Sequence, residues 1–549
     1  MVGLTLAKPD MDQKTVPAMR ADFVIVGGGT AGCVLANRLS ACGRYSVILI
    51  EAGGADHHPW LHIPIGYGKV TGDPRFDWRF STVPQPQLDG RRIGVPRGKV
   101  LGGSSATNGL LYVRGQREDF DGWAAQGCIG WGYDDVLPYF RRSEDQRDGA
   151  DAWHGVGGPL AVRDPVSSHP LCDAFIRGWE VDGLPSSRDF NGAEQEGVGY
   201  YQMTVRGTRR CSTAQGFLRE ARKRPNLQVL TRMRVKRIGF EGRRADSVEV
   251  ERDSGQAMRI AAEREVILSA GALASPQLLM LSGVGPAAHL REHGIGVLRD
   301  SPVGEGLQDH LNVRCTFEAT RPVTINDRLR GPVGQAMSGL EYLLLGRGPL
   351  TVAAGYAGSF YRADGSRGRP DSQAYLLAFS TTPDGRKLRA ESGFMASAYQ
   401  LRPESRGSIR LASADPHAMP LIDPRYLDSD VDRRMTVAAL RRLLRAMAHK
   451  PMSDFIKSSY PPFDSSDAEL LAHIRAIASP GHHFTSTCRM GVGRDAVVDP
   501  RLRVNGLDNL RVADAAIMPS VPSGNTAAPV VMIAEKASDM ILEDARNAM

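Results

Sequence analysis

The stretch from Asp22 to Gly53, DFVIVGGGTAGCVLANRLSACGRYSVILIEAG, constrains the fold more than any other because it contains a strand, a glycine-rich turn, a helix and a second strand in sequence. The uninterrupted apolar run Phe23–Val26 is typical of a strand in a sheet that is covered on both faces. It leads directly into Gly27, Gly29 and Gly32. In a dinucleotide-binding unit these glycines allow, in turn, a tight turn, close approach of a pyrophosphate to the backbone, and close packing of the helix on the strand.

A helix is expected over 32–42, so that its N-terminal amides and the positive end of its dipole face the phosphates. A second strand, expected over Ser46–Ile50, leads to Glu51, which stands 22 residues after Gly29. A carboxylate at this place suits the free hydroxyls of a ribose and repels a 2′-phosphate. The unit predicts a dinucleotide site, with a glycine-rich turn of an ordinary α/β protein as the alternative. It leaves open whether the nucleotide is NAD or FAD.

The size and charge of the chain limit the classes of function. It has 549 residues, of which 42% are hydrophobic, so it is long enough for two or three domains with large buried cores. The net charge of +7 comes from arginines spread along the sequence, with no run of five or more basic residues. We therefore expect a solvated arginine-rich surface and no nucleic-acid partner, while weak attraction to anionic membranes stays open.

The N-terminal segment, the distribution of apolar residues and the cysteines indicate the cellular compartment of the protein. Residues 1–21 carry mixed charges and no apolar run of the signal-peptide kind, which predicts a flexible leader. Nowhere do 18 apolar residues follow one another, so no transmembrane segment is expected. The seven cysteines are odd in number and form no CxxC pair, which argues for a reducing compartment and against a disulfide scaffold or a metal site. These features predict a cytoplasmic protein and leave peripheral contact with the inner membrane open.

The remaining pattern suggests two domains. The segment 52–96 is irregular and rich in Gly, Pro and His, and loops of this length tend to be functional. The last fifty residues again show a short strand, a loop of small residues and a helix, as the first part of the chain does. Both ends of the chain are therefore expected in one domain, with a second domain nested between them. The expected elements are a strand, turn and strand over 227–240, strands at 265–268, 407–411 and 510–514, and helices at 275–281, at 432–447 and from Pro529 to about 542.

Five separated motifs share one order along the chain. They are GGGTAG at 27–32 with Glu51; GKVLGGSS at 98–105 with Asn108; GALASP at 271–276 leading to SGVG at 282–285; HFTSTCRMG at 483–491; and VAD at 512–514 leading to Gly524 and Asn525. In this order they resemble the signatures of the glucose-methanol-choline (GMC) oxidoreductases, particularly the bacterial choline dehydrogenase-like alcohol dehydrogenases. The matches run from residue 22 to 542.

The resemblance implies an α/β fold with an α+β part. A Rossmann-like FAD-binding domain would comprise 22–165, 213–312 and 480–549. A nested substrate-binding domain, with a mixed or antiparallel sheet and helices, would comprise 166–212 and 313–479.

The resemblance also selects FAD as the cofactor. The helix after Pro529 would direct its positive dipole end at the reduced flavin. The residues expected to contact FAD are Gly27, Gly29, Thr30, Ala31, Gly32, Glu51, Ala52, Gly98, Gly102, Gly103, Ser104, Asn108, Gly109, Val235, Ala270, Gly271, Asp514, Ala515, Asn525 and Thr526.

The sequence departs from the family's pattern at two places. Some relatives attach FAD covalently through a histidine where this chain has Thr107, so noncovalent FAD is predicted. The frequent motif GENLQDH appears as GEGLQDH at 304–310, with Gly306 in place of asparagine, which puts the contacts of that amide in doubt. Asp309 and His310 in this motif are expected to serve a structural hydrogen bond and not to form a catalytic pair.

Alcohol oxidation requires a group that removes the hydroxyl proton, and a neutral imidazole suits this near pH 7. The resemblance places His483 in that role and Asn525 as the donor that stabilises the substrate oxygen. If the segment is extended, His482 points the other way, and we expect it to line the substrate cavity or to form a hydrogen bond behind the site. We expect no metal ion, because no further ligand follows the two histidines at metal-binding spacing.

The sequence thus predicts FAD-dependent oxidation of an alcohol to an aldehyde, with electrons passed to a quinone, a cytochrome or another acceptor. The main alternative is an alcohol oxidase that uses O₂ and forms H₂O₂. A hydroxynitrile lyase, a photodecarboxylase and a flavin-binding protein without activity are further alternatives. Choline would require a carboxylate and an aromatic cage, which the sequence does not identify, so a neutral primary alcohol is favoured. Assembly into a homo-oligomer stays open.

Overall fold

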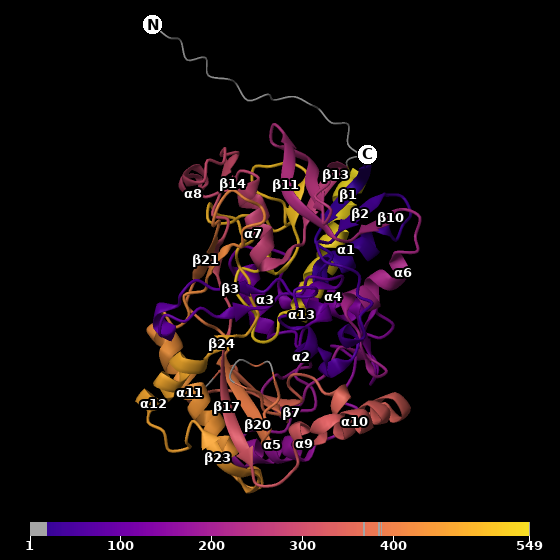
Figure 1. Ribbon diagram of the computed structural model, residues 1–549. Coiled ribbons are helices and arrows are strands. Elements are labelled where there is room, and N and C mark those ends of the chain that lie inside the picture. The colour runs from indigo at the N-terminus through magenta and orange to yellow at the C-terminus, as the bar shows by residue number, and fades with distance from the viewer. Residues whose placement is uncertain (1–18, 366–367, 383–384, 386, 548–549) are drawn as a thin grey trace.

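The computed structural model describes residues 19–365, 368–382, 385 and 387–547 (Figure 1). Residues 1–18 of the expected leader lie outside this range. The last three residues of the expected leader, Met19 to Ala21, belong instead to the first strand, so the leader prediction is wrong there. Figure 1 shows two sheets, one in the upper part of the molecule with both ends of the described chain, and one in the lower part formed by the middle of the chain.

The first sheet is mixed and has seven strands. They are β1 (Met19–Val26), β2 (Val47–Ile50), β10 (Leu227–Leu230), β11 (Met233–Glu241), β12 (Arg244–Arg252), β13 (Ala257–Leu268) and β25 (Leu510–Val512). The order is β10-β2-β1-β13-β12-β11, with β25 beside β13. The strands β10, β2, β1, β13 and β25 are parallel, whereas β11 and β12 form an antiparallel extension.

Helices cover the parallel part of this sheet. They include α1 (Thr30–Ser40), α4 (Tyr133–Ser143), α7 (Gly271–Leu281) and α13 (Ala527–Asn547). α1 follows β1 through the glycine turn and packs against α13, which in turn packs against α4. A Cβ atom on Gly32 would lie 1.9 Å from the carbonyl oxygen of Gly27, so only glycine lets the helix approach the strand this closely. The expected βαβ unit is confirmed.

The second sheet is antiparallel throughout. Its strands are β7 (Gly197–Tyr200), β17 (Leu311–Ala319), β18 (Ala357–Tyr361), β19 (Ser372–Leu377), β20 (Gly393–Gln400), β23 (Ile456–Tyr460) and β24 (Ser479–Pro480). The order is β23-β17-β20-β19-β18-β7, with β24 beside β17. The helices of this part are α5 (Pro170–Val181), α11 (Asp430–Met447) and α12 (Asp467–Ile477). α11 lies on β20, and its side chains Val437, Leu440, Leu443 and Leu444 are buried.

Shorter elements connect these layers. The helices are α2 (Tyr67–Val70), α3 (Arg117–Ala125), α6 (Arg219–Ala221), α8 (Ala287–Glu292), α9 (Ile325–Arg328) and α10 (Gly331–Leu345). The strand pairs are β3 (Phe80–Ser81) with β4 (Gly94–Val95), β5 (Glu144–Gln146) with β6 (Leu160–Val162), β8 (Val205–Arg206) with β9 (Arg209–Arg210), and β14 (Val284–Gly285) with β15 (Arg299–Asp300). A three-stranded sheet contains β16 (Glu305–Leu307), β21 (Gly407–Arg410) and β22 (Leu421–Asp423).

Two large hydrophobic cores correspond to the two main sheets. The strand expected at 407–411 is present as β21, but Ile409 and Leu411 belong to the core of the first sheet, together with Ile422. The sequence assigns β21 to the substrate-binding domain, over 313–479, whereas the structure packs it in the core of the first sheet. The proposed domain ranges remain a prediction. Within the described ranges, no helix has both the length and the apolar character that crossing a bilayer requires.

Candidate active site

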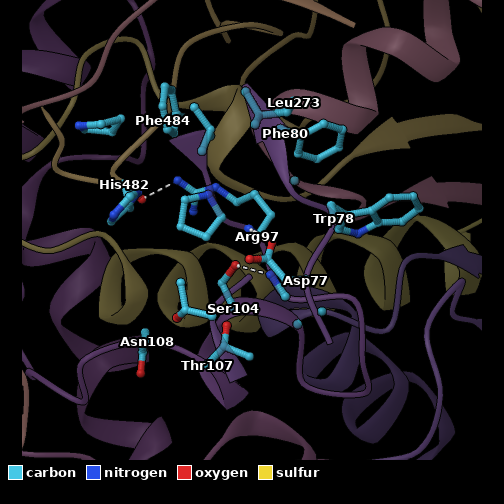
Figure 2. Close-up of a pocket in the computed structure, with 18 of the residues that line it drawn as sticks. Asp77, Trp78, Phe80, Arg97, Ser104, Thr107, Asn108, Leu273, His482 and Phe484 are labelled. Atoms are coloured by element: carbon cyan, nitrogen blue, oxygen red, sulfur yellow. Dashed lines mark hydrogen bonds between the residues drawn. The ribbon is translucent and has the colours of Figure 1, made fainter. Parts of the chain in front are cut away.

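A cavity of about 1440 Å³ extends from the glycine turn after β1 to the antiparallel sheet. Its walls come from both ends of the chain, from the irregular segment after Glu51 and from the strands β17, β19 and β20. Figure 2 shows part of this cavity, with Trp78 and Phe80 on one side and His482 and Asn108 on another. The irregular segment 52–96 thus contributes to the site, as its length suggested.

The carboxylate of Glu51 lies at one end of the cavity. It accepts hydrogen bonds from the amides of Gly28 at 2.9 Å and Gly53 at 2.7 Å. Burial raises the pKa of this carboxyl to about 7, against the lowering effect of the two amides. Glu51 therefore orders the glycine turn in addition to facing the position predicted for a ribose.

The loop after Val100 forms the wall opposite α1. It contains a short 3₁₀ helix, η4 (Gly103–Ala106), and the backbone of Gly103 approaches that of Gly29 so closely that a Cβ atom on Gly103 would lie 2.7 Å from the Gly29 Cα. The Ser104 hydroxyl accepts from the Gly98 amide at 3.3 Å (Figure 2). Because neither glycine has a side chain, the two backbones touch and their main-chain atoms still line the cavity, where an extended ligand can lie against them.

All the residues predicted to contact the cofactor line this cavity, except Gly32 and Gly102. Gly32 instead permits the packing of α1 described above. The Gly102 amide donates to the Gly28 carbonyl at 2.8 Å and therefore lies behind the cavity wall. Asp514 does line the cavity, but its carboxylate accepts from the Gly271 amide at 2.8 Å and the Ser275 hydroxyl at 2.6 Å, joining the ends of β25 and β13.

His483 and Asn525 lie side by side at the far end. The Asn525 Nδ2 atom is 3.0 Å from Nε2 of His483. The Nδ1 atom of His483 is 2.8 Å from Nδ1 of His310, and Nε2 of His310 is 2.8 Å from the carbonyl oxygen of Leu401. The four groups form one continuous hydrogen-bonded chain.

This chain fixes the tautomer of each imidazole. A carbonyl oxygen only accepts, so Nε2 of His310 carries a proton and donates to Leu401. Burial lowers the pKa of His310 to about 4, so the ring is neutral near pH 7 and its Nδ1 is an acceptor. His483 must then donate from its own Nδ1, which leaves an unprotonated Nε2 that faces Asn525. Burial, helped by the positive charge of Arg97, also holds the pKa of His483 well below its ordinary value.

The second sheet orients the Asn525 amide. Gln373 on β19 donates from Nε2 to Oδ1 of Asn525 at 3.3 Å, and the hydroxyl of Tyr399 on β20 donates to the Gln373 Oε1 atom at 2.5 Å. Asn525 therefore presents its donor nitrogen to His483. Sequence reasoning missed Gln373 and Tyr399, because no motif accompanies them.

The motif at 304–310 also has a larger role than predicted. Asp309 accepts from the His483 backbone amide and from the Tyr426 hydroxyl, both at 2.5 Å, so its role is structural, as expected. His310, however, bonds directly to His483, a contact within the candidate site that sequence reasoning missed. Gly306, which replaces the family's asparagine, has φ +76°, a conformation that glycine adopts without strain.

His482 lines the cavity, but the segment through it is not extended as expected. Its φ of +67° lies in the left-handed region, so the alternation argument for the two histidines is wrong. Its carbonyl accepts from Nη2 of Arg97 at 2.7 Å (Figure 2), and its buried Nδ1 has no partner within the described chain. Burial lowers the pKa of this imidazole to about 3, so it is neutral.

Known families and relatives match most of the chain. Models of the GMC oxidoreductase N- and C-terminal regions match residues 21–312 and 403–534. The chain is 41% identical over 533 residues to an oxygen-dependent choline dehydrogenase of Brucella ovis, covering 95% of this chain and 96% of the relative. It is 40% identical over 531 residues to an alcohol dehydrogenase [acceptor] of Pseudomonas putida, covering 95% of each.

Solved structures resemble it over nearly the whole chain. Pyridoxine 4-oxidase from Mesorbium loti superposes with a TM-score of 0.85 at 34% identity, covering 94% of this chain and 98% of that one. A formate oxidase of Aspergillus oryzae RIB40, studied for FAD modification, superposes with a TM-score of 0.89 at 27% identity, covering 97% and 100%.

Proposed function

The chain belongs to the GMC oxidoreductase family, and from this premise we propose that it is an FAD-dependent enzyme that oxidises a primary alcohol to an aldehyde. The electrons pass to an acceptor other than oxygen, such as a quinone or a cytochrome. The observation that carries the proposal is the Leu401–His310–His483–Asn525 chain, which leaves one unprotonated imidazole nitrogen and one amide donor together at the end of the cavity.

The residues present fit FAD. The backbones of Gly29 and Gly103 in the cavity wall would accept a pyrophosphate, and Glu51 would receive the ribose hydroxyls. The start of α13 follows Asn525 and Thr526 in the cavity wall, so its amides and dipole would face the flavin end. Thr107 also lines the cavity, and a threonine hydroxyl gives no reason to expect a covalent link.

Two side chains of the protein would then act on the substrate hydroxyl, one on its proton and one on the negative charge that develops on its oxygen. FAD, when bound, supplies the hydride acceptor at N5 of its ring. His483 accepts the hydroxyl proton at Nε2, and Asn525 donates from Nδ2 to the oxygen as it gains negative charge. A substrate hydroxyl replaces the direct contact of 3.0 Å between these two groups. His310 keeps Nε2 of His483 unprotonated until this transfer, and it holds the ring in place throughout.

The assignment of a non-oxygen acceptor is supported by the similarity to an alcohol dehydrogenase [acceptor], whereas the likeness to two oxidase structures supports the alternative use of O₂. All seven cysteines are free thiols, which supports a location in the cytoplasm.

The test is anaerobic mixing of the FAD-loaded enzyme with a panel of primary alcohols, followed by reoxidation with air or with an artificial dye. We expect an alcohol to bleach the flavin, and dye to reoxidise it much faster than air. Faster reoxidation by air, with formation of H₂O₂, would identify an oxidase. Cleavage of a cyanohydrin without flavin bleaching by any alcohol would refute the proposal altogether.

A further inference from the structure

Four buried polar atoms in the cavity wall have no hydrogen-bond partner in the described chain. They are the hydroxyl of Tyr67, Nε of Arg97, Nε of Arg314 and Nδ1 of His482. Arg97 already donates from Nη2 to the His482 carbonyl, whereas the side chains of Tyr67, Arg314 and His482 form no hydrogen bond within the described chain. An unsatisfied buried polar group costs about 1–3 kcal/mol, so such a set in one cavity wall indicates a ligand with several acceptors.

The charge around these side chains is positive. The positive charges of Arg97 and Arg314 both lower the pKa of His482, and those of Arg314 and Arg210 act to lower the pKa of Tyr67. None of the described carboxylates forms an ion pair with Arg314. The carboxylates in the cavity wall are held by other groups, as Glu51 and Asp514 are by backbone amides.

Arg314 lies on the strand β17, which forms part of the cavity wall. Asn312 and Arg314 are two residues apart on it and share the face that lines the cavity, where the Tyr375 hydroxyl donates to Oδ1 of Asn312 at 3.0 Å. Arg314 is four residues beyond His310, which corresponds to roughly 13 Å along a strand at about 3.3 Å per residue. Because His310 contacts the ring of His483, Arg314 and the proposed base are held at separate places along this segment of the chain.

We propose that Arg314, Tyr67 and His482 form a subsite for an anionic group, so that the substrate is a primary alcohol with a carboxylate at the opposite end of the molecule. Arg314 and Tyr67 donate to the carboxylate oxygens, and His482 donates from Nδ1 as a neutral ring. A quaternary ammonium such as choline is excluded as a substrate, because its positive charge would lie beside the positive charge of Arg314, whereas such a group binds to anions or aromatic rings. This inference rests on the proposed alcohol oxidation.

The experiment compares alcohols of one shape and different charge in anaerobic flavin reduction. The probes are 4-(hydroxymethyl)benzoate, its methyl ester, benzyl alcohol and choline. We expect the carboxylate to be preferred over the ester by at least tenfold in the ratio of reduction rate to half-saturating concentration, and choline to be inactive. The substitution Arg314→Met should remove this preference by slowing only the carboxylate, whereas Arg321→Met, at an exposed arginine near the far end of β17, should not.

A binding measurement that needs no turnover accompanies it. Benzoate, which has no hydroxyl group, should raise the melting temperature of the wild-type holoenzyme and of Arg321→Met but not of Arg314→Met. Equal activity on the ester and the carboxylate, or equal slowing of both by Arg314→Met, would overturn the subsite and leave alcohol oxidation intact. Failure of every alcohol to bleach the flavin, with benzoate still bound through Arg314, would instead refute the proposed function.

A second, independent feature is the helix α10, which Figure 1 shows at the edge of the lower part of the molecule. Glu341 is its only charged residue and pairs with Arg328 and Arg347. The large apolar side chains that it exposes are Val333, Met337, Leu340, Leu343, Leu344 and Leu345, each between 57% and 78% exposed. A contiguous apolar face of this kind marks an interaction surface.

The surroundings of α10 are basic. Arg328 and Arg330 precede the helix, and Arg347 follows it. The exposed Arg206 and Arg209 belong to the β8–β9 hairpin beside it, where the Thr208 carbonyl accepts a hydrogen bond from the Tyr342 hydroxyl of α10 at 3.1 Å. Against these five cations stand two acids, Asp327 and Glu341. Past its end the chain continues through Pro349–Thr351 to Ala354 and Gly355, which line the cavity.

We infer that α10 docks on an anionic phospholipid surface, with its leucines in the acyl boundary and the arginines at the headgroups. Vesicles of phosphatidylglycerol and phosphatidylcholine should carry the holoenzyme upward in a flotation gradient, and vesicles of phosphatidylcholine alone should carry several-fold less. The double substitution Leu340→Gln/Leu344→Gln should abolish flotation and preserve reduction of a soluble dye, while Ile129→Gln, at an 84% exposed isoleucine elsewhere, should change neither. Absence of flotation, or a dimer that the double substitution dissociates, would overturn the inference.

Discussion

Replacing His310 by phenylalanine should slow flavin reduction while FAD stays bound. The substitution removes the acceptor of the His483 Nδ1 proton, which lies at 2.8 Å in a fully buried place. Keeping the productive tautomer then costs about 1–3 kcal/mol for an unsatisfied buried donor. Since each 1.36 kcal/mol is a factor of ten, the rate should fall by roughly 5- to 150-fold. The alternative for the ring is to move its proton to Nε2, which removes the base.

The assay is stopped-flow absorbance under anaerobic conditions at saturating alcohol, on enzyme whose FAD content has been measured. His310→Gln offers an oxygen acceptor to the same proton and should recover most of the rate, which a purely structural role of the ring would not explain. His449→Gln, at a histidine outside the cavity wall, is the control. If His310→Phe reduces FAD at the wild-type rate, or if His310→Gln is no faster than His310→Phe, the tautomer argument is refuted.

Three further outcomes are expected. His483→Ala should lower the rate of flavin reduction by about 10²-fold or more with FAD retained, on the usual size of general-base effects, and an unchanged rate would move the role to His482. Glu51→Ala should weaken FAD binding by roughly 10- to 100-fold, measured by fluorescence of the released flavin, because it leaves two buried amides unpaired at about 1–3 kcal/mol each. Burial raises the pKa of Asp309 from 3.8 to about 7, so its contribution to stability is complete below pH 3.8 and is lost as the pH rises through 7. The melting temperature of Asp309→Asn should therefore fall less than that of wild type between pH 5 and 8, and parallel curves would contradict the assignment.

The sequence predicted the structure best where a complete structural unit lies within one short segment. The βαβ unit, α11 and the start of α13 are local patterns of periodicity and turn residues, and each was predicted within a few residues of its observed bounds. The geometry around His482, with its φ of +67°, was not, because its carbonyl is held by Arg97, more than 380 residues away in the chain. Gln373 and Tyr399 stayed unrecognised for the same reason, since strand pairing alone brings them to Asn525.

The motif at 304–310 explains how a site assembled from such distant segments stays ordered. It lies where the chain leaves β16 and enters β17, between the two main sheets, and consecutive side chains bond to different segments. Gln308 accepts from the Val521 amide at 2.9 Å, Asp309 accepts from the His483 amide, and His310 meets the His483 ring. Because both the backbone and the ring of His483 are held from one turn, movement of the second sheet against the first would displace the base together with its acceptor. The hydrogen bond that selects the tautomer would then survive such a movement, and the proposed substrate wall, with Asn312 and Arg314 on the strand that follows, could change without disturbing the proposed proton acceptor.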